Sequence, residues 1–398
     1  MIEINRKIYP VLKTELNYDE ITILIGARQV GKTHLMKKLF KLYQKQGKKA
    51  KFYDLEQPET LLLFNKSEQD IIKELVRDNN VIFLDEFYYI KNASHIFKAI
   101  YDSGYKTKIF ASGSSSLQIH KHLKESLAGR KRIYTIFPCS YQEMIDLWGN
   151  NCLENYLKYG GLPGISKYKN TKDIILLLSD IHQSYILKDV KSLLKEENIR
   201  IFNNLIYLLA ERQGSIISIN NLARELTLTS KSIDNYLNIL SHTGVAFLVM
   251  SFSRNMGNEL KKSKKTYLYD IGIRNMILKD FRNLAEREDR GYIYESFVFL
   301  ELQKMVDPLS EIRFWRTKDG KEVDFIFIRN RIPFPIEVKS RIKPGEVTSG
   351  LSAFLHRYPQ VPKAFVFNLE YEGQVDFNNT KIYYKKLTAI SKFIRWIN

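Results

Sequence analysis

The chain has 398 residues, 44% of them hydrophobic, which suits two or three globular domains rather than one. It has no stretch near the roughly 20 apolar residues that cross a bilayer, no secretory signal in its opening MIEINRKIYP and only two cysteines, so we expect a cytoplasmic protein without a membrane span or disulfide framework. The formal net charge of +18 indicates a polyanion partner such as DNA, unless it reflects only a composition rich in Lys, Asn, Ile and Tyr.

The first predicted element is a short buried strand, ITILI, at residues 21–25, followed by a helix that Gly47 ends. Between them, GARQVGKT fits the phosphate-binding pattern GxxxxGK(S/T) in the strand–loop–helix context that this pattern requires. Its glycines let backbone N–H groups surround phosphate oxygens at the positive end of the helix. The alternative is a chance glycine turn. The predicted nucleotide-binding residues are Gly26, Ala27, Arg28, Gln29, Val30, Gly31, Lys32, Thr33 and His34.

Within this loop we expect Lys32 to reach the β- and γ-phosphates and the Thr33 hydroxyl to ligate Mg²⁺. A second buried strand, VIFL at residues 81–84, ends in Asp85 and Glu86. Asp85 can hold the Mg²⁺, and Glu86 can orient and deprotonate the attacking water. Alone, this acidic pair would be interpreted as a helix N-terminal cap, but the phosphate loop favours the catalytic interpretation.

The next predicted strand ends in Ser112-Gly113-Ser114-Ser115, so Ser114 is a candidate contact to the γ-phosphate, although an ordinary loop is equally consistent. Arg130 then follows a glycine in a predicted turn. It is either an arginine finger that acts on a neighbouring subunit's site or a surface charge in a basic patch. The alternation of strands and helices up to residue 150 predicts an α/β fold with a parallel sheet.

At this point the motifs GARQVGKT, VIFLDEF, ASGSSS and LAGR, followed by PCSYQEM, resemble the AAA-type P-loop ATPases of prokaryotes (AAA_14-like) that carry a DUF4143 C-terminal region. The resemblance covers nearly the whole chain. It implies an AAA+ fold, ATP with Mg²⁺ as the nucleotide, and a homo-oligomer such as a ring. The spacing of the motifs by itself indicates only a nucleoside triphosphatase.

After the ATPase core, YLKYGGLPGI at residues 156–165 interrupts regular structure and resembles the GG-x-P signature of the same family. A helix predicted from about residue 173 to 195 makes residues 151–199 a helical connector. Residues 200–275 then read as a helix closed by Gly214, two shorter helices and two strands, which is a winged-helix pattern. Ser218 or Asn220 is expected to cap the first short helix and Ser230 the second.

In a DNA-binding winged helix the second short helix, about Ser230–His242, enters the major groove. Its early residues Lys231, Ser232 and Asn235 would then lie nearest the bases. The wing lysines suited to phosphate contacts are Lys261, Lys262, Lys264 and Lys265. Because the helix carries only one lysine, a protein-binding module is the alternative.

The final segment, residues 276–398, places charges among apolar residues in neighbouring strands. Strand alternation predicts Asp324 on the face opposite Val323, and Glu337 with Lys339 on one face of the next strand. Burying unpaired charge is costly, so an ordinary sheet would avoid this pattern. A metal nuclease has a use for it: Asp324 and Glu337 can bind Mg²⁺, Lys339 can activate water or stabilise developing charge, and Glu295 on the preceding helix can complete the metal site.

The predicted order α-β-β-β-α-β with these residues resembles the PD-(D/E)xK nuclease fold, also found in Holliday-junction resolvases, with Val323 in place of the non-ligating proline. Two alternatives remain: a degenerate fold kept as a DNA- or protein-binding platform, and a simple salt-bridge set of Asp324, Lys339 and Glu337. The predicted architecture is therefore α/β, with an N-terminal AAA+ P-loop domain (1–150), a helical connector (151–199), a winged helix (200–275) and a nuclease-like domain (276–398).

Together these motifs predict an ATP-hydrolysing protein that binds DNA and cuts it with a Mg²⁺-dependent C-terminal nuclease domain, acting on duplex DNA or on branched DNA such as Holliday junctions. The alternative function is an ATP-dependent switch or assembly ATPase whose nuclease-like domain is a non-cutting platform.

Overall fold

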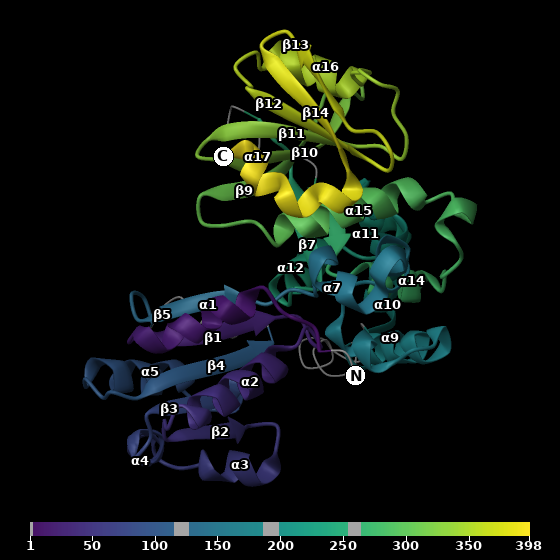
Figure 1. Ribbon diagram of the computed structural model, residues 1–398. Helices are drawn as coiled ribbons and strands as arrows, with labels where there is room; N and C mark the ends of the chain where they lie inside the picture. Colours follow the sequence, from purple (N-terminus) through teal and green to yellow (C-terminus); the bar gives the residue numbers. More distant parts are fainter. Residues whose placement is uncertain (1–2, 115–126, 186–198, 254–263) are drawn as a thin grey trace. The chain divides into compact units, whose positions relative to one another are not determined.

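The computed structural model describes residues 3–114, 127–185, 199–253 and 264–398 of the chain (Figure 1). Two compact units are present, and their boundary passes through one helix, α12. The first unit comprises Met1–Cys139, Leu162–Lys167 and Asn238–Val245, and the second comprises Ser140–Gly161, Tyr168–Leu237 and Ala246–Asn398. Among the described helices, none combines the length and the apolar composition needed to cross a membrane.

The first unit is built on a five-stranded sheet in the order β2-β3-β4-β1-β5, and all four neighbouring pairs are parallel. This confirms the parallel sheet expected from the alternation of strands and helices. Its strands are β1 Ile21–Gly26, β2 Ala50–Asp54, β3 Val81–Asp85, β4 Lys108–Ser114 and β5 Lys131–Thr135. Its helices are α1 Ile8–Thr14, α2 Lys32–Lys45, α3 Pro58–Leu63, α4 Glu68–Val76 and α5 Ala93–Asp102.

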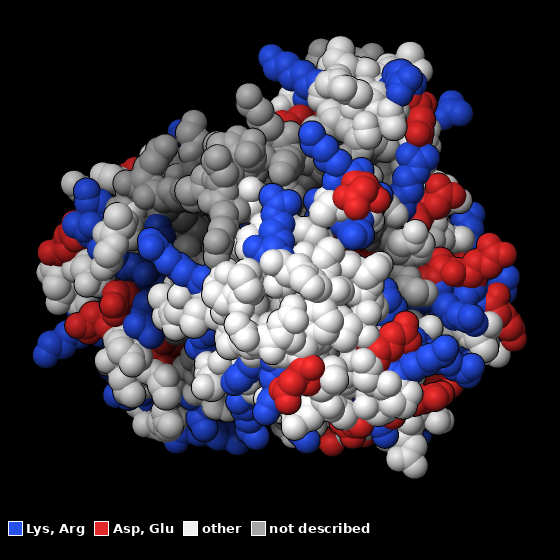
Figure 2. Space-filling view, turned by 90° about the horizontal axis from the view of Figure 1, so that it is seen from above, with Lys and Arg blue, Asp and Glu red and all other residues white. Residues whose placement is uncertain are grey.

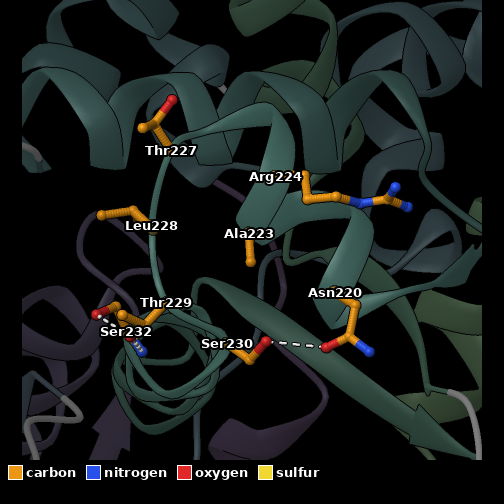
Figure 3. A pocket seen from close by; sticks show the side chains of 8 residues that line it. All are labelled: Asn220, Ala223, Arg224, Thr227, Leu228, Thr229, Ser230 and Ser232. Carbon is orange, nitrogen blue, oxygen red and sulfur yellow. Dashed lines mark hydrogen bonds between the residues drawn. The ribbon is translucent and has the colours of Figure 1, made fainter.

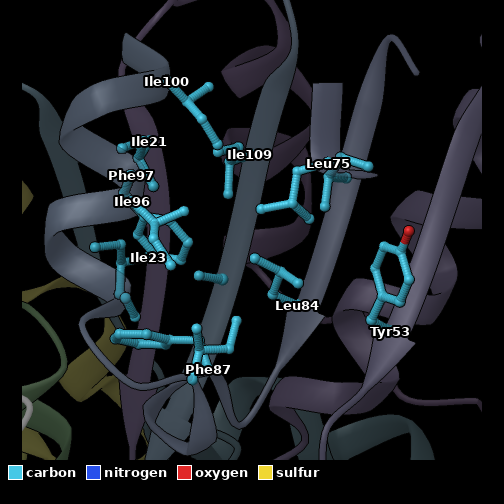
Figure 4. Close-up of a cluster of buried hydrophobic side chains, with 14 of the residues drawn as sticks. Ile21, Ile23, Tyr53, Leu75, Leu84, Phe87, Ile96, Phe97, Ile100 and Ile109 are labelled. Atoms are coloured by element: carbon cyan, nitrogen blue, oxygen red, sulfur yellow. The ribbon is translucent and has the colours of Figure 1, made fainter. Parts of the chain in front are cut away.

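Apolar side chains on both faces hold this sheet between its helices. On one face, the Tyr43 ring of α2 lies 6.2 Å from that of Phe83 and 5.8 Å from that of Phe110, measured between ring centroids. On the other face, Ile82 of β3 and Ile109 of β4 join a buried cluster with residues of α4 and α5 (Figure 4). Both faces of this sheet are therefore covered, as is usual for a parallel sheet.

The second unit contains two sheets. A three-stranded antiparallel sheet has the order β6-β8-β7, and a six-stranded mixed sheet has the order β13-β14-β12-β11-β10-β9. The strands are β6 Ile216–Ile217, β7 Ala246–Met250, β8 Lys264–Leu268, β9 Ser310–Arg316, β10 Glu322–Arg329, β11 Ile332–Val338, β12 Lys363–Asn368, β13 Gly373–Phe377 and β14 Thr380–Lys386. The helices outside the predicted winged helix are α7 Tyr141–Trp148, α8 Cys152–Tyr159, α9 Thr171–Tyr185, α14 Ile271–Leu278, α15 Arg290–Gln303, α16 Ser349–Arg357 and α17 Phe393–Ile397.

The three helices and two strands predicted between residues 200 and 275 are present as α10 Ile199–Glu211, α11 Ile219–Glu225, α12 Ser230–His242, β7 and β8, while their assignment as a winged helix stays a prediction. Ser218 caps α11, because its side chain accepts a hydrogen bond from the Asn221 N–H. The prediction that Ser230 caps α12 is wrong by one residue. The helix begins at Ser230, so the hydroxyl of the preceding Thr229 accepts from the Ser232 N–H at 3.1 Å.

The predicted order α-β-β-β-α-β is present as α15, β9, β10, β11, α16 and β12. Strand alternation predicts Val323 and Ile326 on opposite faces of β10, and this prediction is wrong. A register shift between β9 and β10 separates Val323 from Ile326, and both side chains lie in one core cluster with Phe354 of α16. This irregularity in the pairing interrupts the strand, so simple alternation does not carry through Asp324.

The chain that follows β7 also pairs with β9. Ser251 forms a bridge with Phe314, and the Phe252 N–H donates to the Phe314 carbonyl at 2.6 Å. The wing strands and the C-terminal sheet are therefore joined within one compact unit. The division into an ATPase domain, a helical connector, a winged helix and a nuclease-like domain stays a prediction.

Candidate functional site

The predicted phosphate loop lies between the end of β1 and the start of α2. Gly31 precedes the helix with a φ of 96°, a conformation that side-chain-bearing residues rarely adopt. Lys32 is 5% exposed, and its ammonium group donates to the carbonyls of Gly26 at 2.9 Å and Ala27 at 3.0 Å. Thr33 is half-buried in the first turn of α2, and His34 is exposed. The lysine is thus folded over the loop, where phosphate oxygens can replace the two carbonyls as its acceptors.

Two residues that the sequence did not single out support this loop. The Arg6 guanidinium donates to the carbonyls of Val30 at 2.8 Å and Phe137 at 2.7 Å. The Pro163 ring, from the glycine-rich segment after the ATPase core, lies 3.4 Å from where a Cβ on Gly31 would be. Both contacts join segments far apart in the sequence, so residue spacing carries no signal for Arg6. The glycine-rich segment was recognised as a break in regular structure and by its resemblance to the GG-x-P signature, but its contact with Gly31 was not expected.

The remaining loop residues are held by local contacts. Ala27 and Val30 are buried, and Gln29 takes a left-handed φ of 62°. Arg28 lies 3.7 Å from the Glu56 carboxylate, so its guanidinium has an intramolecular acidic partner.

The acidic pair after β3 lies at the same edge of the sheet as the loop, because β4 separates β3 from β1 and all three strands are parallel. Asp85 is 3% exposed and accepts a hydrogen bond from the Ser112 hydroxyl. Glu86 is 9% exposed and adopts a left-handed φ of 55° directly after the strand. Ser114 is in register with Gly26, and its side chain lies outside the described part of the structure. The sheet therefore gathers the predicted phosphate and metal residues of this domain at one edge.

Arg130 lies at the opposite edge of the sheet. Its carbonyl accepts from the N–H of Ile21, the first residue of β1, at 2.9 Å. Its guanidinium binds Asp102, with Nε 2.6 Å from Oδ1 and a terminal nitrogen 3.2 Å from Oδ2. The arginine therefore does not face the phosphate loop of its own chain, and a role in a neighbouring subunit's site stays a prediction.

The predicted DNA-reading helix presents Lys231 and Asn235 to solvent, while Ser232 is half-buried. The turn between α11 and α12 borders an open pocket of about 1070 Å³, lined by Arg224 and by the hydroxyls of Thr229 and Ser230 among others (Figure 3). In that turn the Ser230 hydroxyl donates to the Asn220 amide oxygen at 2.9 Å.

Of the four wing lysines, Lys261 and Lys262 lie outside the described residues. The Lys264 ammonium lies 3.2 Å from the Asp234 carboxylate of α12. The prediction that Lys265 contacts DNA phosphates is wrong, because its side chain is 1% exposed and lies inside the second unit. On the face in Figure 2, basic side chains lie around the margin with acidic ones among them. On that face the net positive charge is therefore not gathered into one patch.

At the far end of the chain, β10 and β11 bring three of the predicted nuclease residues together. One Asp324 carboxylate oxygen accepts from the Val338 N–H at 2.7 Å. The Lys339 ammonium lies 2.7 Å from Glu337 Oε1, and the Glu337 side chain is 4% exposed. Glu337 Oε2 is buried and has no hydrogen-bond partner among the residues that the structure describes. A buried carboxylate oxygen without a donor is costly and leaves one acceptor position for a cation.

Glu295 is close to this cluster but is bound by other residues. Its Oε1 accepts from the Lys265 ammonium at 3.0 Å and from the Tyr267 hydroxyl at 2.5 Å. Lys265 also lies 2.6 Å from Glu322 Oε1. In the described part of the chain, no group of three or more His, Cys, Asp and Glu residues is placed to hold a metal ion. Lys265 and Tyr267 bind Glu295, and the predicted metal-binding role of Glu295, Asp324 and Glu337 stays a prediction.

Three members of this cluster were not predicted from the sequence: Lys265, Tyr267 and Glu322. The strand KKTYL places Lys265 and Tyr267 two residues apart on one face, which was the available signal. What the strand pattern could not reveal is that this face turns toward α15 and β10.

The electrostatics of the cluster indicate a shortage of positive charge. Burial, together with the neighbouring Asp324 carboxylate, raises the pKa of Glu337 to about 8. Burial raises the pKa of Glu295 to about 7, although the Lys265 ammonium opposes the shift. Burial lowers the pKa of Lys339, but the Glu337 and Asp324 carboxylates outweigh it and leave that pKa raised. A further cation would stabilise the ionised forms of these carboxyl groups.

Comparison with known proteins divides the chain into three matched regions. Residues 18–145 match the family model described as an AAA domain. Residues 150–284 match a domain of unknown function, DUF8612, and residues 290–387 match a second one, DUF4143.

Relatives and solved structures are distant. An uncharacterized protein of Methanocaldococcus jannaschii is 26% identical over an alignment of 338 residues, and the match covers 79% of this chain and 74% of that protein. An uncharacterized protein of Mycobacterium tuberculosis is 24% identical over an alignment of 347 residues, and the match covers 86% of this chain and 76% of that protein. A signal transduction ATPase with numerous domains and a tetratricopeptide repeat sensor, from Pyrococcus horikoshii, aligns at 13% identity and a TM-score of 0.31. That alignment covers 77% of this chain and only 46% of the other.

The AAA domain match and the geometry of the phosphate loop together support an AAA-type ATPase that carries a DUF4143 region.

Proposed function

We propose that this protein hydrolyses ATP at its N-terminal phosphate loop and cuts DNA phosphodiester bonds with a divalent cation held at its C-terminal cluster. The DNA-cutting activity is proposed from one observation: the buried Glu337 Oε2 lacks a hydrogen-bond partner among the described residues, while the same carboxylate forms an ion pair with Lys339. The AAA domain match supports the ATP-hydrolysing activity.

At the nucleotide site, the residues of the loop bind and orient the triphosphate. Backbone N–H groups at the start of α2 point toward the phosphates, and Lys32 exchanges its two carbonyl acceptors for phosphate oxygens. Thr33 and Asp85 are the candidate ligands of the nucleotide's Mg²⁺, which neutralises charge on the β- and γ-phosphates. Glu86, at the end of β3, orients the attacking water and accepts its proton.

At the C-terminal cluster, two carboxylates suffice for a magnesium ion. Mg²⁺ keeps several waters and is commonly bound through one or two carboxylates plus substrate phosphates. Asp324 and Glu337 would supply those carboxylates, and a cation held there would polarise the scissile phosphate and lower the pKa of a water. The Lys339 side chain is 41% exposed, so it can reach a phosphate in solvent and stabilise the charge that develops there.

DNA would be held mainly by the predicted winged helix. Lys231 and Asn235 are exposed on α12, and Arg224 lines the neighbouring pocket. Lys261 and Lys262 remain candidates for phosphate contacts in the wing. We propose duplex or branched DNA, Holliday junctions included, as the substrate, and a homo-oligomer such as a ring as the active form.

A specific observation favours a second candidate, an ATP-dependent switch with a non-cutting C-terminal platform. Lys265 already neutralises Glu295 and Glu322 by direct ion pairs, as in a purely structural charge network. In this case the C-terminal domain would bind DNA or a protein partner without cleaving it.

The test is a panel of junction, fork, duplex and single-stranded DNA incubated with and without ATP and Mg²⁺. We expect Mg²⁺-dependent cleavage by the wild type and by Asp319→Asn, which changes an exposed carboxylate in the turn before β10. Asp324→Asn should lose cleavage. An inactive wild type that still binds DNA in an ATP-dependent way would favour the platform.

A further inference from the structure

Lys265 is a lysine in an unusual place. It belongs to β8 of the wing sheet, yet its side chain is 1% exposed, and its ammonium lies 2.6 Å from Glu322 Oε1 and 3.0 Å from Glu295 Oε1. The same ammonium lies 5.5 Å from the centre of the Phe314 ring. Although burial acts to lower the pKa of Lys265, the carboxylates of Glu295, Asp324 and Glu322 outweigh it and raise that pKa.

The acceptor oxygens around this ammonium are unevenly used. Glu295 Oε1 accepts from both Lys265 and Tyr267, and the second carboxylate oxygen of Glu322 binds Arg316 at 2.8 Å. By contrast, Glu337 Oε2 has no hydrogen-bond donor among the described residues. Glu337 thus differs from Glu295 and Glu322: Lys339 binds its Oε1, and its buried Oε2 has no donor among the described residues.

A compact ammonium with three donors occupies the kind of position that a metal ion takes among carboxylates. Removing it would leave two carboxylates close together without their counter-charge, which is strongly unfavourable in a buried setting. Those carboxylates would then have to take up protons or another cation.

We propose that Lys265 is a resident cation of the C-terminal site: it binds Glu295 and Glu322, and so leaves a divalent metal ion only Asp324 and Glu337. This inference rests on the proposed metal-binding function of that pair. Lys265 is then a positioning residue that fixes how many divalent ions the cluster holds. Because Lys265 comes from the wing strand, the proposed DNA-binding module contributes directly to the metal site.

The test uses the full-length protein without nucleotide and measures Mn²⁺ binding by electron paramagnetic resonance and calorimetry. The variant Lys265→Met keeps the length of the side chain and removes its charge. We expect this variant to bind a second Mn²⁺ ion that the wild type does not bind. Without Mn²⁺, the melting temperature of the variant should be lower than that of the wild type. Added Mn²⁺ should raise the melting temperature of the variant by more than it raises the melting temperature of the wild type.

Lys264→Met is the matched control. It removes the same charge from the neighbouring residue and breaks one ion pair with Asp234, but that lysine is partly exposed and does not touch the carboxylate cluster. It should bind no additional Mn²⁺. The double variant Lys265→Met/Glu295→Gln removes both partners of one ion pair, so no buried carboxylate of that pair is left without its counter-charge. We expect it to fold without Mn²⁺, even if Lys265→Met alone does not. It should not bind the second Mn²⁺ ion.

The possible failures are distinguishable. If Lys265→Met binds no additional ion and the double variant behaves identically, the role of Lys265 as a resident cation is refuted, while the metal site of Asp324 and Glu337 stands. If the wild type binds no Mn²⁺ and Asp324→Asn changes nothing, the proposed metal site itself is refuted and this inference falls with it.

Discussion

At the scale of single residues, the two candidate sites hold their lysines in different ways. Lys32 is bound by backbone carbonyls of its own loop, which are neutral acceptors that phosphate oxygens outcompete. Lys339 is bound by the Glu337 carboxylate, so it neutralises a buried charge until a cation or a phosphate arrives. A lysine in the first setting recognises a ligand, and a lysine in the second also stabilises the fold.

The nucleotide site gives the first prediction. Lys32→Ala should reduce ATP turnover by roughly 10²-fold or more, because it removes a positive charge from the transferred phosphate. Glu86→Gln should leave nucleotide binding intact while stopping hydrolysis, since the amide cannot accept the proton of the attacking water. Steady-state phosphate release and binding of a fluorescent ATP analogue measure the two effects. Equal loss of binding and turnover in Glu86→Gln would argue against the role of Glu86 as the base.

A second prediction at this scale concerns pH and stability. Asp270 is 2% exposed, and its carboxylate accepts from the N–H groups of Gly161 at 2.7 Å and Ile273 at 3.1 Å. Burial nevertheless raises its pKa from 3.8 to about 6. Because the folded state holds this proton more tightly than the unfolded chain, the resulting stability is complete below about pH 4 and is lost as the pH rises through about 6.

Asp270→Asn removes this dependence, because the amide does not titrate. The wild type should lose roughly 2–3 kcal/mol from this group between pH 4 and pH 7, and the variant should not. The variant should also be less stable at every pH, since an amide has only one acceptor oxygen for the two N–H groups. Thermal unfolding of both proteins from pH 4.5 to pH 7 measures the difference, and parallel curves would contradict the prediction.

At the scale of elements, the packing of α16 on β10 determines where Glu322 lies. A Cβ on Gly350 of α16 would stand 1.8 Å from the Glu322 carbonyl oxygen, so the helix reaches the strand only because this residue has no side chain. The register shift after Val323 and this close approach occur in the same part of β10. Together they fix the strand segment that carries both Glu322 and Asp324.

Gly350→Ala should therefore destabilise the protein by about 1–3 kcal/mol, the usual cost of inserting a methyl group into a packed contact. Gly291→Ala is the matched control, because Gly291 lies in α15 with no atom within 4 Å of the added Cβ. That change should be neutral or slightly stabilising, since alanine favours helix more than glycine does. Chemical denaturation of the two variants measures the difference, and equal midpoints would refute the packing argument.

At the scale of the whole molecule, the features that follow local patterns were predictable from the sequence. The parallel sheet, the phosphate loop and the order of elements from α15 to β12 depend on short apolar runs and on glycine spacing, which a single chain displays. Contacts between distant segments were not predictable. The bond from Arg6 to Val30 and the ion pair of Lys265 with Glu322 join residues whose partners no periodicity reveals. The register shift after Val323 likewise interrupts the alternation on which the predicted faces depended.

Assembly gives a further prediction at this scale. Arg130 lies beside the first residue of β1, whereas the phosphate loop follows the last residue of that strand. A strand of six residues spans about 20 Å, so Arg130 cannot reach phosphates bound at the loop of its own chain. If it acts as an arginine finger, it acts on a neighbouring subunit. Mixing Arg130→Ala protein with Lys32→Ala protein should then restore part of the ATPase activity that each has lost. If no mixing ratio restores activity, Arg130 is not an arginine finger and is only a surface residue bound to Asp102.

We have proposed that two separate sites of this chain, one at each end, each hold a divalent ion against phosphate oxygens. Anomalous scattering from crystals grown with Mn²⁺ and a non-hydrolysable ATP analogue tests it most directly. We expect one manganese peak beside Thr33 and Asp85 and another between Asp324 and Glu337, within bonding distance of Glu337 Oε2. Crystals that show the first peak and none at Glu337 would contradict the metal-dependent C-terminal site, and absence of both would contradict the account as a whole.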